Sequence, residues 1–568
     1  MRLFNIKNFY IYFGHRLHRR LYSSKNAPSP EYLTKLRECY RLEEDNNIVV
    51  PVFKKALLYG NNIAIRDHAG EYSYFQLYSN SKRLSRQIAN LCGSSGSSST
   101  VAFFYSNDVL STLTLWACWM CGQVAMPLRL DFSCSGLVNL LKLSKTRLLV
   151  APEKYGNLSR KLAYQLDVPT LCLDHMFIKK HNLPFNYSRE IFMNANLVIL
   201  EGTLTNDFYT TFDALLLNTL GKINKLKTAV LSHKNLSVQI KSAASAWQVS
   251  AEDRVFQIFT SDHINGYINA TLFPLEAGGT VQMHEPFDAN NCWSTILGIN
   301  TPQKDRVNIL IAEPKVYNVL ITEYEKIFLK NSRMVEFIKN YCMRNFRLMI
   351  SSFSPLPQHV ANRWFEITGH NIMESLYITE SGITLRYNPQ HDQANTQKQN
   401  HVTLAFNNTL SDVKVRIVDN SNRIIYDSQD LKVHTRYLVD SPTIVGSLLV
   451  AGPGVFRNYL NSEKPSNEKE SYFNTGDIVC YEDGLFKLLG RCKGEERFNT
   501  LTTMTDIEEF YSRLNLHPSI NFDKLENRGV VYAIKPNQRM SLKSLKLFYA
   551  IILKEYYRAI VFHLNTNK

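Results

Sequence analysis

Short apolar runs separated by helix-like segments recur along most of the chain, and they constrain its fold more than any other feature. In chain order they include DALLL, RVFQIF, VNILIA and FRLMIS. Each run has the length of a buried strand, and the segments between them carry the apolar spacing of helices. This alternation predicts a large α/β domain built on mixed or parallel sheets. After about residue 410, shorter runs such as VKVRIVD and GSLLVAG indicate a small β-rich subdomain.

The length of the chain calls for more than one hydrophobic core. At 568 residues it is expected to form two or more domains, and its 45% hydrophobic and 20% charged residues are typical of globular proteins. The most apolar window, TLTLWACWMCGQVAMPL, is too short for a membrane span and predicts a buried helix. Cys118 and Cys121 within it lack the second cysteine pair of a zinc ribbon, so buried free thiols are expected.

The N-terminal segment differs from the rest in charge. Residues 1–30 hold six Lys and Arg and no Asp or Glu, which predicts a mitochondrial transit peptide followed by a Pro/Ser spacer. The run Arg20–Ser23 resembles a matrix-protease site, so the mature protein is expected in the mitochondrial matrix. A basic arm on nucleic acid or on a membrane surface is the alternative. The rest of the chain predicts no nucleic-acid partner and no transmembrane segment, and it carries no signal for an oligomeric state.

Seven motifs in sequence carry a family resemblance. They are LSHKNL, QIFTSDHINGYINATLFPLEAGGTVQM, VNILIAEPKVYNVL, RLMISSFSPLP, ESLYITESG, GSLLVAGPGVFRNYLN and FNTGDIVCYEDGLFKLLGR. In order and spacing they resemble the AMP-forming acyl-CoA synthetase (adenylate-forming) family over nearly the whole chain from about residue 50. The N-terminal run PVFKKALLYGNNIAIRDHAGEYSY and the late HPSI are most similar to the mitochondrial malonyl-CoA synthetase branch.

The resemblance implies an architecture and a reaction. An AMP-binding N-terminal domain is expected over 45–490 and a shortened α+β C-terminal domain over 491–568. Enzymes of this family adenylate a small carboxylic acid with ATP and Mg²⁺ and then transfer the acyl group to coenzyme A. The C-terminal domain rotates between the two half-reactions.

The resemblance also assigns candidate roles to single residues. Within YITES, Thr379 corresponds to a phosphate contact and Glu380 to the Mg²⁺ ligand, an apt donor because hard cations prefer carboxylate oxygen. Asp477 corresponds to the carboxylate that binds the ribose hydroxyls, and Arg491 to the arginine at the domain junction. His263 matches a histidine of the acyl pocket, although a lone histidine beside an apolar helix is also a common structural residue.

The stretch NTLGKINKLK, Asn218–Lys227, lies between the apolar run DALLL and the run TAVLSHKNLSVQI, for which we predict a helix. Strand, loop and helix in this order are typical of phosphate sites. Thr219, Gly221 and Lys227 match the phosphate loop of the family. The other positions have lost two hydroxyl side chains and a glycine, so the sequence predicts an ancestral phosphate loop that is now eroded.

Further departures bear on catalysis. Thr500 and Leu501 stand where the family has glycines that approach coenzyme A, and their side chains argue against that approach. The terminal lysine motif has no counterpart, and Ser375 stands where an arginine for malonate's second carboxylate is expected. The favoured hypothesis is an acyl-CoA synthetase family protein with impaired catalysis. The alternatives are an inactive nucleotide-binding or scaffold pseudoenzyme, a fully working ligase, and an incomplete gene model.

Overall fold

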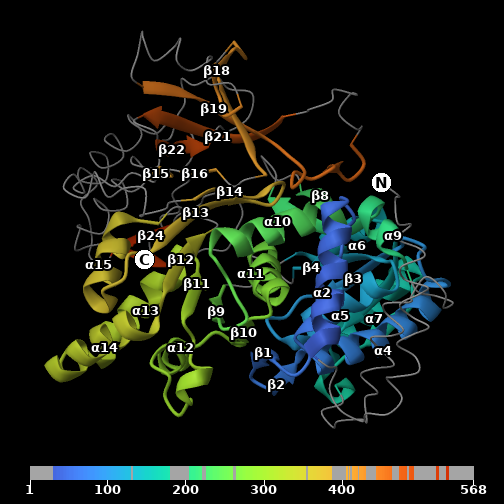
Figure 1. Cartoon of the computed structure of the whole chain (residues 1–568), viewed down its shortest axis with the longest axis horizontal. Helices are drawn as coiled ribbons and strands as arrows, with labels where there is room; N and C mark the ends of the chain where they lie inside the picture. The colour runs from blue at the N-terminus through green and yellow to red at the C-terminus, as the bar shows by residue number, and fades with distance from the viewer. Residues whose placement is uncertain are drawn as a thin grey trace, which may run out of the picture.

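The computed structural model describes residues 30–129, 132–178, 204–220, 226–259, 264–352, 356–386, 405–406, 408–409, 412–419, 421–429, 443–462, 472–482, 485–491, 520–523 and 533–536. Two large sheets and the helices around them form the body of the molecule, and a third sheet lies at one end (Figure 1). The α/β expectation with mixed sheets is confirmed.

The seven-stranded sheet has the order β20-β8-β7-β4-β3-β5-β6. Its strands are β3 (Thr100–Phe104), β4 (Val124–Leu128), β5 (Thr146–Ala151), β6 (Thr170–Cys172), β7 (Asp213–Leu220), β8 (Leu226–Ser232) and β20 (Asn458–Tyr459). The strands from β7 to β6 run parallel, whereas β8 is antiparallel to both of its neighbours. The helices of this part are α4 (Tyr74–Cys92), α5 (Val109–Met120), α6 (Cys134–Leu143), α7 (Gly156–Leu166) and α9 (Asn206–Thr211).

The nine-stranded sheet has the order β16-β14-β13-β12-β11-β9-β10-β1-β2. Its strands are β1 (Ile63–Asp67), β2 (Gly70–Ser73), β9 (Arg254–Ile258), β10 (Thr280–Met283), β11 (Ile309–Ala312), β12 (Leu348–Ser352), β13 (Met373–Ile378), β14 (Gly382–Arg386) and β16 (Asn408–Thr409). Strands β1, β10, β9, β11, β12 and β13 are parallel. The helices are α10 (His233–Ala246), α11 (Ile264–Ala277), α12 (Ala289–Ile296), α13 (Pro314–Ile327), α14 (Ser332–Asn345) and α15 (Gln358–Thr368).

One hydrophobic core joins the two sheets. It contains Leu215 of β7 and Ile311 of β11 together with buried residues of α4, α5, α10 and α11. Helix α2 (Pro30–Asp45), which the expected domain limits leave unassigned, adds Leu36 and Tyr40 to the same core. The short α3 (Val52–Lys55) and the 3₁₀ turns η1 (Ala56–Leu58), η2 (Glu153–Tyr155), η3 (His175–Phe177) and η4 (Gln303–Asp305) complete the helical elements of the described residues.

The expected β-rich subdomain is an antiparallel six-stranded sheet, with the order β15-β22-β21-β19-β17-β18. Its strands are β15 (Ala405–Phe406), β17 (Lys414–Val418), β18 (Ile424–Asp427), β19 (Thr443–Ala451), β21 (Phe473–Glu482) and β22 (Leu485–Arg491). It has a core of its own that includes Val415, Leu448 and Val479. Of the expected C-terminal domain, the structure describes a hairpin of β23 (Ile520–Asp523) and β24 (Ala533–Pro536).

Several local expectations are confirmed and one is wrong. The apolar window forms α5, and Cys118 and Cys121 are buried free thiols within the main core. No helix among the described residues is long and apolar enough to cross a bilayer. The segment TAVLS, predicted as the start of a helix, instead forms most of β8, because its backbone pairs with β7 along the whole strand. The helix begins only at His233, after the capping serine Ser232.

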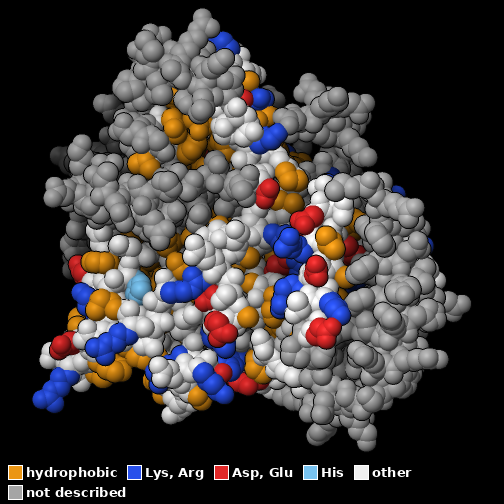
Figure 2. All heavy atoms as spheres, in the orientation of Figure 1, with side chains coloured by type: hydrophobic (Ala, Val, Ile, Leu, Met, Phe, Trp, Pro, Cys, Tyr) orange, Lys and Arg blue, Asp and Glu red, His pale blue; other side chains and the backbone are white. Residues whose placement is uncertain are grey.

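Lys and Arg are interspersed with Asp and Glu on the described part of the face shown in Figure 2. Ion pairs among the described residues include Glu44 with Lys241 at 2.8 Å and Arg66 with Glu71 at 2.8 Å. Mixed charges of this kind do not concentrate a positive potential on this face.

Candidate active site

The candidate residues Thr379 and Glu380 lie in the tight turn between β13 and β14. Gly382 closes this turn with φ of 73°, a left-handed conformation that favours glycine. Glu380 is only 5% exposed, and its Oε1 accepts a hydrogen bond from the hydroxyl of Tyr459 at 2.7 Å. Its carbonyl oxygen accepts one from the backbone N–H of Phe456 at 2.6 Å. The turn is therefore held against the segment that enters β20.

One residue of the phosphate-loop stretch, Lys227, is linked to this turn through Tyr459. Thr219 and Lys227 are direct partners in the β7–β8 hairpin, and the Lys227 ammonium lies 4.6 Å from the centre of the Tyr459 ring. Tyr459 thus contacts Lys227 through its ring and Glu380 through its hydroxyl. Gly221 and the rest of the loop lie outside the described residues. The sequence of elements is strand, loop, strand, so the phosphate-type helix does not directly follow the loop.

Helix α10 holds the segment that precedes Tyr459. The side-chain amide of Asn235 donates hydrogen bonds to the carbonyl oxygens of Pro453 at 2.8 Å and Val455 at 2.7 Å. The side-chain amide of Gln239 donates to the carbonyl oxygen of Gly454 at 2.7 Å. Because the side chains of Asn235 and Gln239 are buried, these hydrogen bonds fix the backbone just before β20. They thereby position the tyrosine against the carboxylate.

Asp477 and Arg491 are direct partners in the β21–β22 ladder. Asp477 is 5% exposed, and its backbone N–H donates to Thr475 Oγ1 at 3.0 Å. The same strand begins at Phe473, whose ring lies 5.1 Å from that of Phe456. The strand of Asp477 therefore packs on the segment that holds the Glu380 turn.

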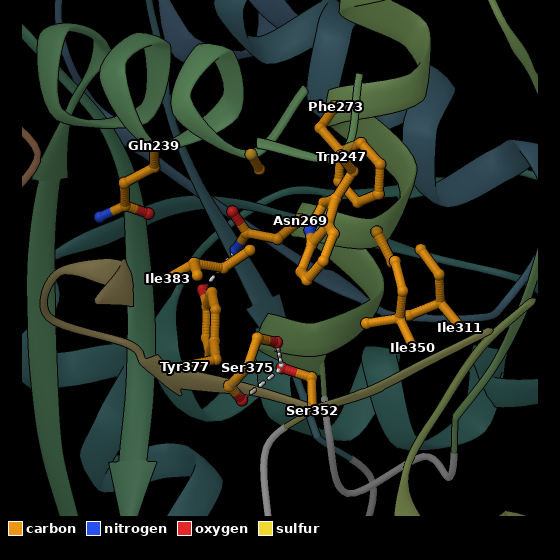
Figure 3. Close-up of a pocket in the computed structure, with 12 residues that line it drawn as sticks. Gln239, Trp247, Asn269, Phe273, Ile311, Ile350, Ser352, Ser375, Tyr377 and Ile383 are labelled. Carbon is orange, nitrogen blue, oxygen red and sulfur yellow. Dashed lines mark hydrogen bonds between the residues drawn. The ribbon is translucent and has the colours of Figure 1, made fainter. Parts of the chain in front are cut away.

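A pocket lies next to the same turn, between α10, α11 and the carboxyl-terminal ends of the parallel strands (Figure 3). Ligands in α/β proteins characteristically bind at these strand ends. The space measures about 390 Å³, part of it open to solvent. The lining residues that the structure describes are all neutral; they are Gln239, Ala243, Trp247, Asn269, Ala270, Phe273, Ile311, Ile350, Ser352, Ser375, Tyr377 and Ile383.

Four polar side chains of the pocket wall bond to one another in two pairs. The side-chain amide of Asn269 donates to the hydroxyl of Tyr377, and Ser375 Oγ donates to Ser352 Oγ at 2.9 Å (Figure 3). Burial, and to a smaller extent the charge of Glu380, raises the pKa of the Tyr377 phenol. Tyr377 therefore remains a neutral phenol across the physiological range.

The structure thus brings Lys227 and Glu380 together through a residue to which the sequence assigned no role. Tyr459 lies in the quoted run GVFRNYLN, but nothing in that run indicates which distant carboxylate it meets. Asn235 was equally unassigned, although its capping position after Ser232 is a recognisable helix-start signal. The expectations for His263, Thr500 and Leu501 lie outside the described residues. The side chain of Arg491 is outside them too, although its backbone pairs with Asp477.

Comparison with known proteins bears directly on this geometry. The family model described as AMP-binding enzyme matches residues 224–460, a span that contains the Glu380 turn, the pocket and Tyr459. The chain is 31% identical over 454 residues to the mitochondrial malonate–CoA ligase ACSF3 of Xenopus laevis, covering 78% of this chain and 74% of that protein. The chain belongs to the AMP-binding enzyme family. The human malonate–CoA ligase ACSF3 is 29% identical over 78% of this chain and 74% of its own length.

Solved structures of this family share the fold. ATP-bound MatB from Rhodopseudomonas palustris has a TM-score of 0.63 at 18% identity, covering 90% of this chain and 95% of that one. The o-succinylbenzoate CoA synthetase MenE from Bacillus subtilis, in complex with the acyl-adenylate intermediate OSB-AMP, has a TM-score of 0.64 at 18% identity, with 90% and 94% covered. The family model and the curated relatives together identify an AMP-forming CoA ligase that resembles the malonyl-CoA synthetase branch.

Proposed function

We propose that this protein is a mitochondrial acyl-CoA synthetase family member that binds adenine nucleotide and activates a carboxylic acid at a much reduced rate. Its acid is one with a neutral acyl chain rather than malonate. The neutral pocket beside the Glu380 turn is the observation that carries the substrate choice. Mitochondrial residence is supported by the acid-free basic segment 1–30 and by the mitochondrial relatives.

In this proposal the residues that match the motifs of the family keep the roles that the family assigns to them. Asp477 accepts hydrogen bonds from the ribose hydroxyls, and Thr379 and Lys227 lie toward the phosphates. Glu380 offers a buried carboxylate braced by Tyr459, and Mg²⁺ in nucleotide sites is commonly held by one or two carboxylates together with phosphate oxygens. The residues present therefore fit this ion, which when bound would neutralise phosphate charge. Arg491 stands at the junction to the C-terminal segment, and His263 toward the acyl pocket.

The pocket argues against a dicarboxylic acid. A second carboxylate in a buried site needs a cation or several hydrogen-bond donors, because burying an uncompensated charge is costly. Every described residue of the lining is uncharged, and Ser375, at the expected arginine position, is bonded to Ser352. The indole of Trp247, the ring of Phe273 and Ile350 instead offer contacts for an apolar chain (Figure 3).

Reduced turnover is supported by two separate sequence changes. The phosphate loop has lost hydroxyl groups, and Thr500 and Leu501 replace glycines on the coenzyme A side. Removing a single electrostatic contributor of this type costs about 10²–10³ in rate. The bulky Tyr377 also stands where the family has glycine. A pseudoenzyme that only binds nucleotide is the second candidate, favoured by the same losses.

Two assays on the purified mature protein separate these possibilities. Calorimetric titration with AMP and with Mg-ATP should give similar affinities, because the ribose contact is retained while the phosphate loop is eroded, and Asp477→Ala should abolish both. Incubation with Mg-ATP, coenzyme A and either malonate, methylmalonate or butyrate should yield slow acyl-CoA formation, fastest with butyrate. Turnover with malonate near a typical ligase rate of about 10 s⁻¹ would refute both the impaired catalysis and the neutral pocket. Nucleotide binding with no product from any acid would support the pseudoenzyme.

A further inference from the structure

A cluster of histidine and carboxylate side chains lies far from the candidate active site. Asp67 and His68 occupy the turn between β1 and β2, and His175 begins η3, just after β6. One potential ligand atom from each of the three lies within 4.8 Å of the others. We infer that Asp67, His68 and His175 form a binding site for a divalent metal ion of the zinc class.

Asp67 is held in place by backbone donors. Its Oδ1 accepts hydrogen bonds from the N–H groups of Ala69 at 2.8 Å and Gly70 at 3.1 Å. Its Oδ2 accepts one at 3.0 Å from the N–H of Val109, at the start of α5. Each carboxylate oxygen has two lone pairs, so these bonds orient the group and leave it able to bind an ion. Metal-ligating carboxylates are commonly braced in this way.

His175 has a carboxylate partner on one ring nitrogen. Its Nε2 lies 3.4 Å from Oδ2 of Asp108, and Oδ1 of Asp108 accepts hydrogen bonds from Ser106 Oγ at 2.7 Å and from the N–H of Leu110 at 3.0 Å. A carboxylate behind a histidine fixes the tautomer and orients the ring toward a metal.

The donor set selects the class of ion. Two imidazoles and one carboxylate suit Zn²⁺ and the similar Co²⁺ and Ni²⁺, whereas Mg²⁺ and Ca²⁺ prefer oxygen donors alone. Bonds of about 2.0–2.1 Å in a tetrahedral site place ligand atoms about 3.3 Å apart. The present ligand atoms, which lie within 4.8 Å of one another, must therefore approach by up to about 1.5 Å on binding. His68 is exposed and therefore free to turn toward the ion, and water completes the coordination.

The site is distinct from the nucleotide region and joins two parts of the fold. β1 and β13 are separated by four strands in the nine-stranded sheet, a distance of about 24 Å (Figure 1). The ion would tie the β1–β2 turn of that sheet to η3, which follows the edge strand of the seven-stranded sheet. The role expected from this position is to fix the two sheets relative to each other.

Aromatic packing is the competing explanation for the two histidines. Their ring centres lie 5.0 Å apart at an interplanar angle of 78°, an edge-to-face contact that needs no metal. Packing alone predicts no saturable metal affinity and no change of stability with zinc. The two explanations therefore differ in a measurable way.

The test uses the full chain after chelator treatment and dialysis. Titration with ZnCl₂ should show one site per chain, and His68→Asn and His175→Asn should each weaken it about ten- to a hundredfold. Zinc should raise the melting temperature of the wild type and of the control His359→Asn, an exposed histidine on α15, but not of the His68/His175 double variant. Circular dichroism of each variant checks that it is folded.

Substitution with Co²⁺ distinguishes this site from binding by the cysteines. The visible spectrum should show the bands of a site with nitrogen and oxygen ligands and no sulfur-to-cobalt charge transfer. These bands should vanish in the double variant. Binding of zinc that is equal in the wild type and the double variant, or a thiolate spectrum, would overturn the inference. So would the absence of saturable binding.

Discussion

Replacing Tyr459 by phenylalanine tests the geometry of the candidate active site directly. The change removes only the hydroxyl that donates to Glu380 at 2.7 Å and keeps the ring beneath Lys227. Glu380 is 5% exposed, so water cannot readily replace the lost donor. A hydrogen bond to a charged group contributes about 1.5–3 kcal/mol, and we expect the free energy of unfolding to fall by that amount.

Tryptophan fluorescence during urea unfolding is the suitable assay. All five tryptophans lie between Trp116 and Trp364, so the signal reports the large domain and not the C-terminal segment. The matched control is Tyr164→Phe, which removes a hydroxyl from a side chain that is 91% exposed and should change stability by less than about 0.5 kcal/mol. Lys227→Met in the Tyr459→Phe background should cost the same as in the wild type, because the ring remains.

Ligand binding provides a second readout. The ratio of the affinities for Mg-ATP and AMP would not change if Tyr459 had only a structural role. If the tyrosine orients the carboxylate for Mg²⁺, Tyr459→Phe should weaken binding of Mg-ATP about tenfold or more and leave AMP binding unchanged. An unchanged ratio of the two affinities would show that Glu380 does not serve the metal. Unchanged stability would show that the buried hydrogen bond does not exist.

Three further predictions concern other parts of the chain. Ser375→Arg should place a cation in the neutral pocket and raise the preference for malonate over butyrate about ten- to a hundredfold, measured as the ratio of acyl-CoA formation rates. Burial lowers the pKa of His233 to about 3, below the value of about 6.5 in the unfolded chain, so its contribution is complete above pH 6.5 and is lost as the pH falls toward 3. The urea stability of the wild type should therefore drop by about 2 kcal/mol more between pH 7 and pH 5 than that of His233→Leu, and equal drops would contradict the burial argument. N-terminal sequencing of the protein from mitochondria should begin at or near Ser23, and an intact Met1 would exclude cleavage there.

The sequence predicted where the strands and helices of this fold lie better than it predicted which strands pair with one another. Runs such as VNILIA and FRLMIS are recognisable as strands because most of their positions are apolar, as in strands that are covered on both faces. TAVLS was misassigned because a short apolar run next to a helix start fits either structure, and only its pairing with β7 decides.

The candidate active site shows the same limit, because contacts between distant parts of the chain could not be predicted. Glu380 and Asp477 could be named from local motifs, whereas the role of Tyr459 depends on a contact between residues 79 positions apart. The neutral character of the described pocket lining likewise became visible only when six separate strands and helices were brought together around it. The sequence alone showed that serine replaces the expected arginine at position 375. It did not show that the hydroxyl of Ser375 is bonded to that of Ser352.

The two residues of β20 are synthesised long after β8, the strand with which they pair. They cover β8, a strand whose other edge is paired with β7, yet they lie some 230 positions later in the chain. At a synthesis rate of about 5–20 residues per second, the ribosome needs roughly 10–50 s to supply them after β8 has emerged. During that interval β8 presents an unpaired edge to other nascent chains. Shielding by a chaperone should therefore matter most in this window, and a fragment ending near residue 450 should aggregate more readily than one ending near residue 465.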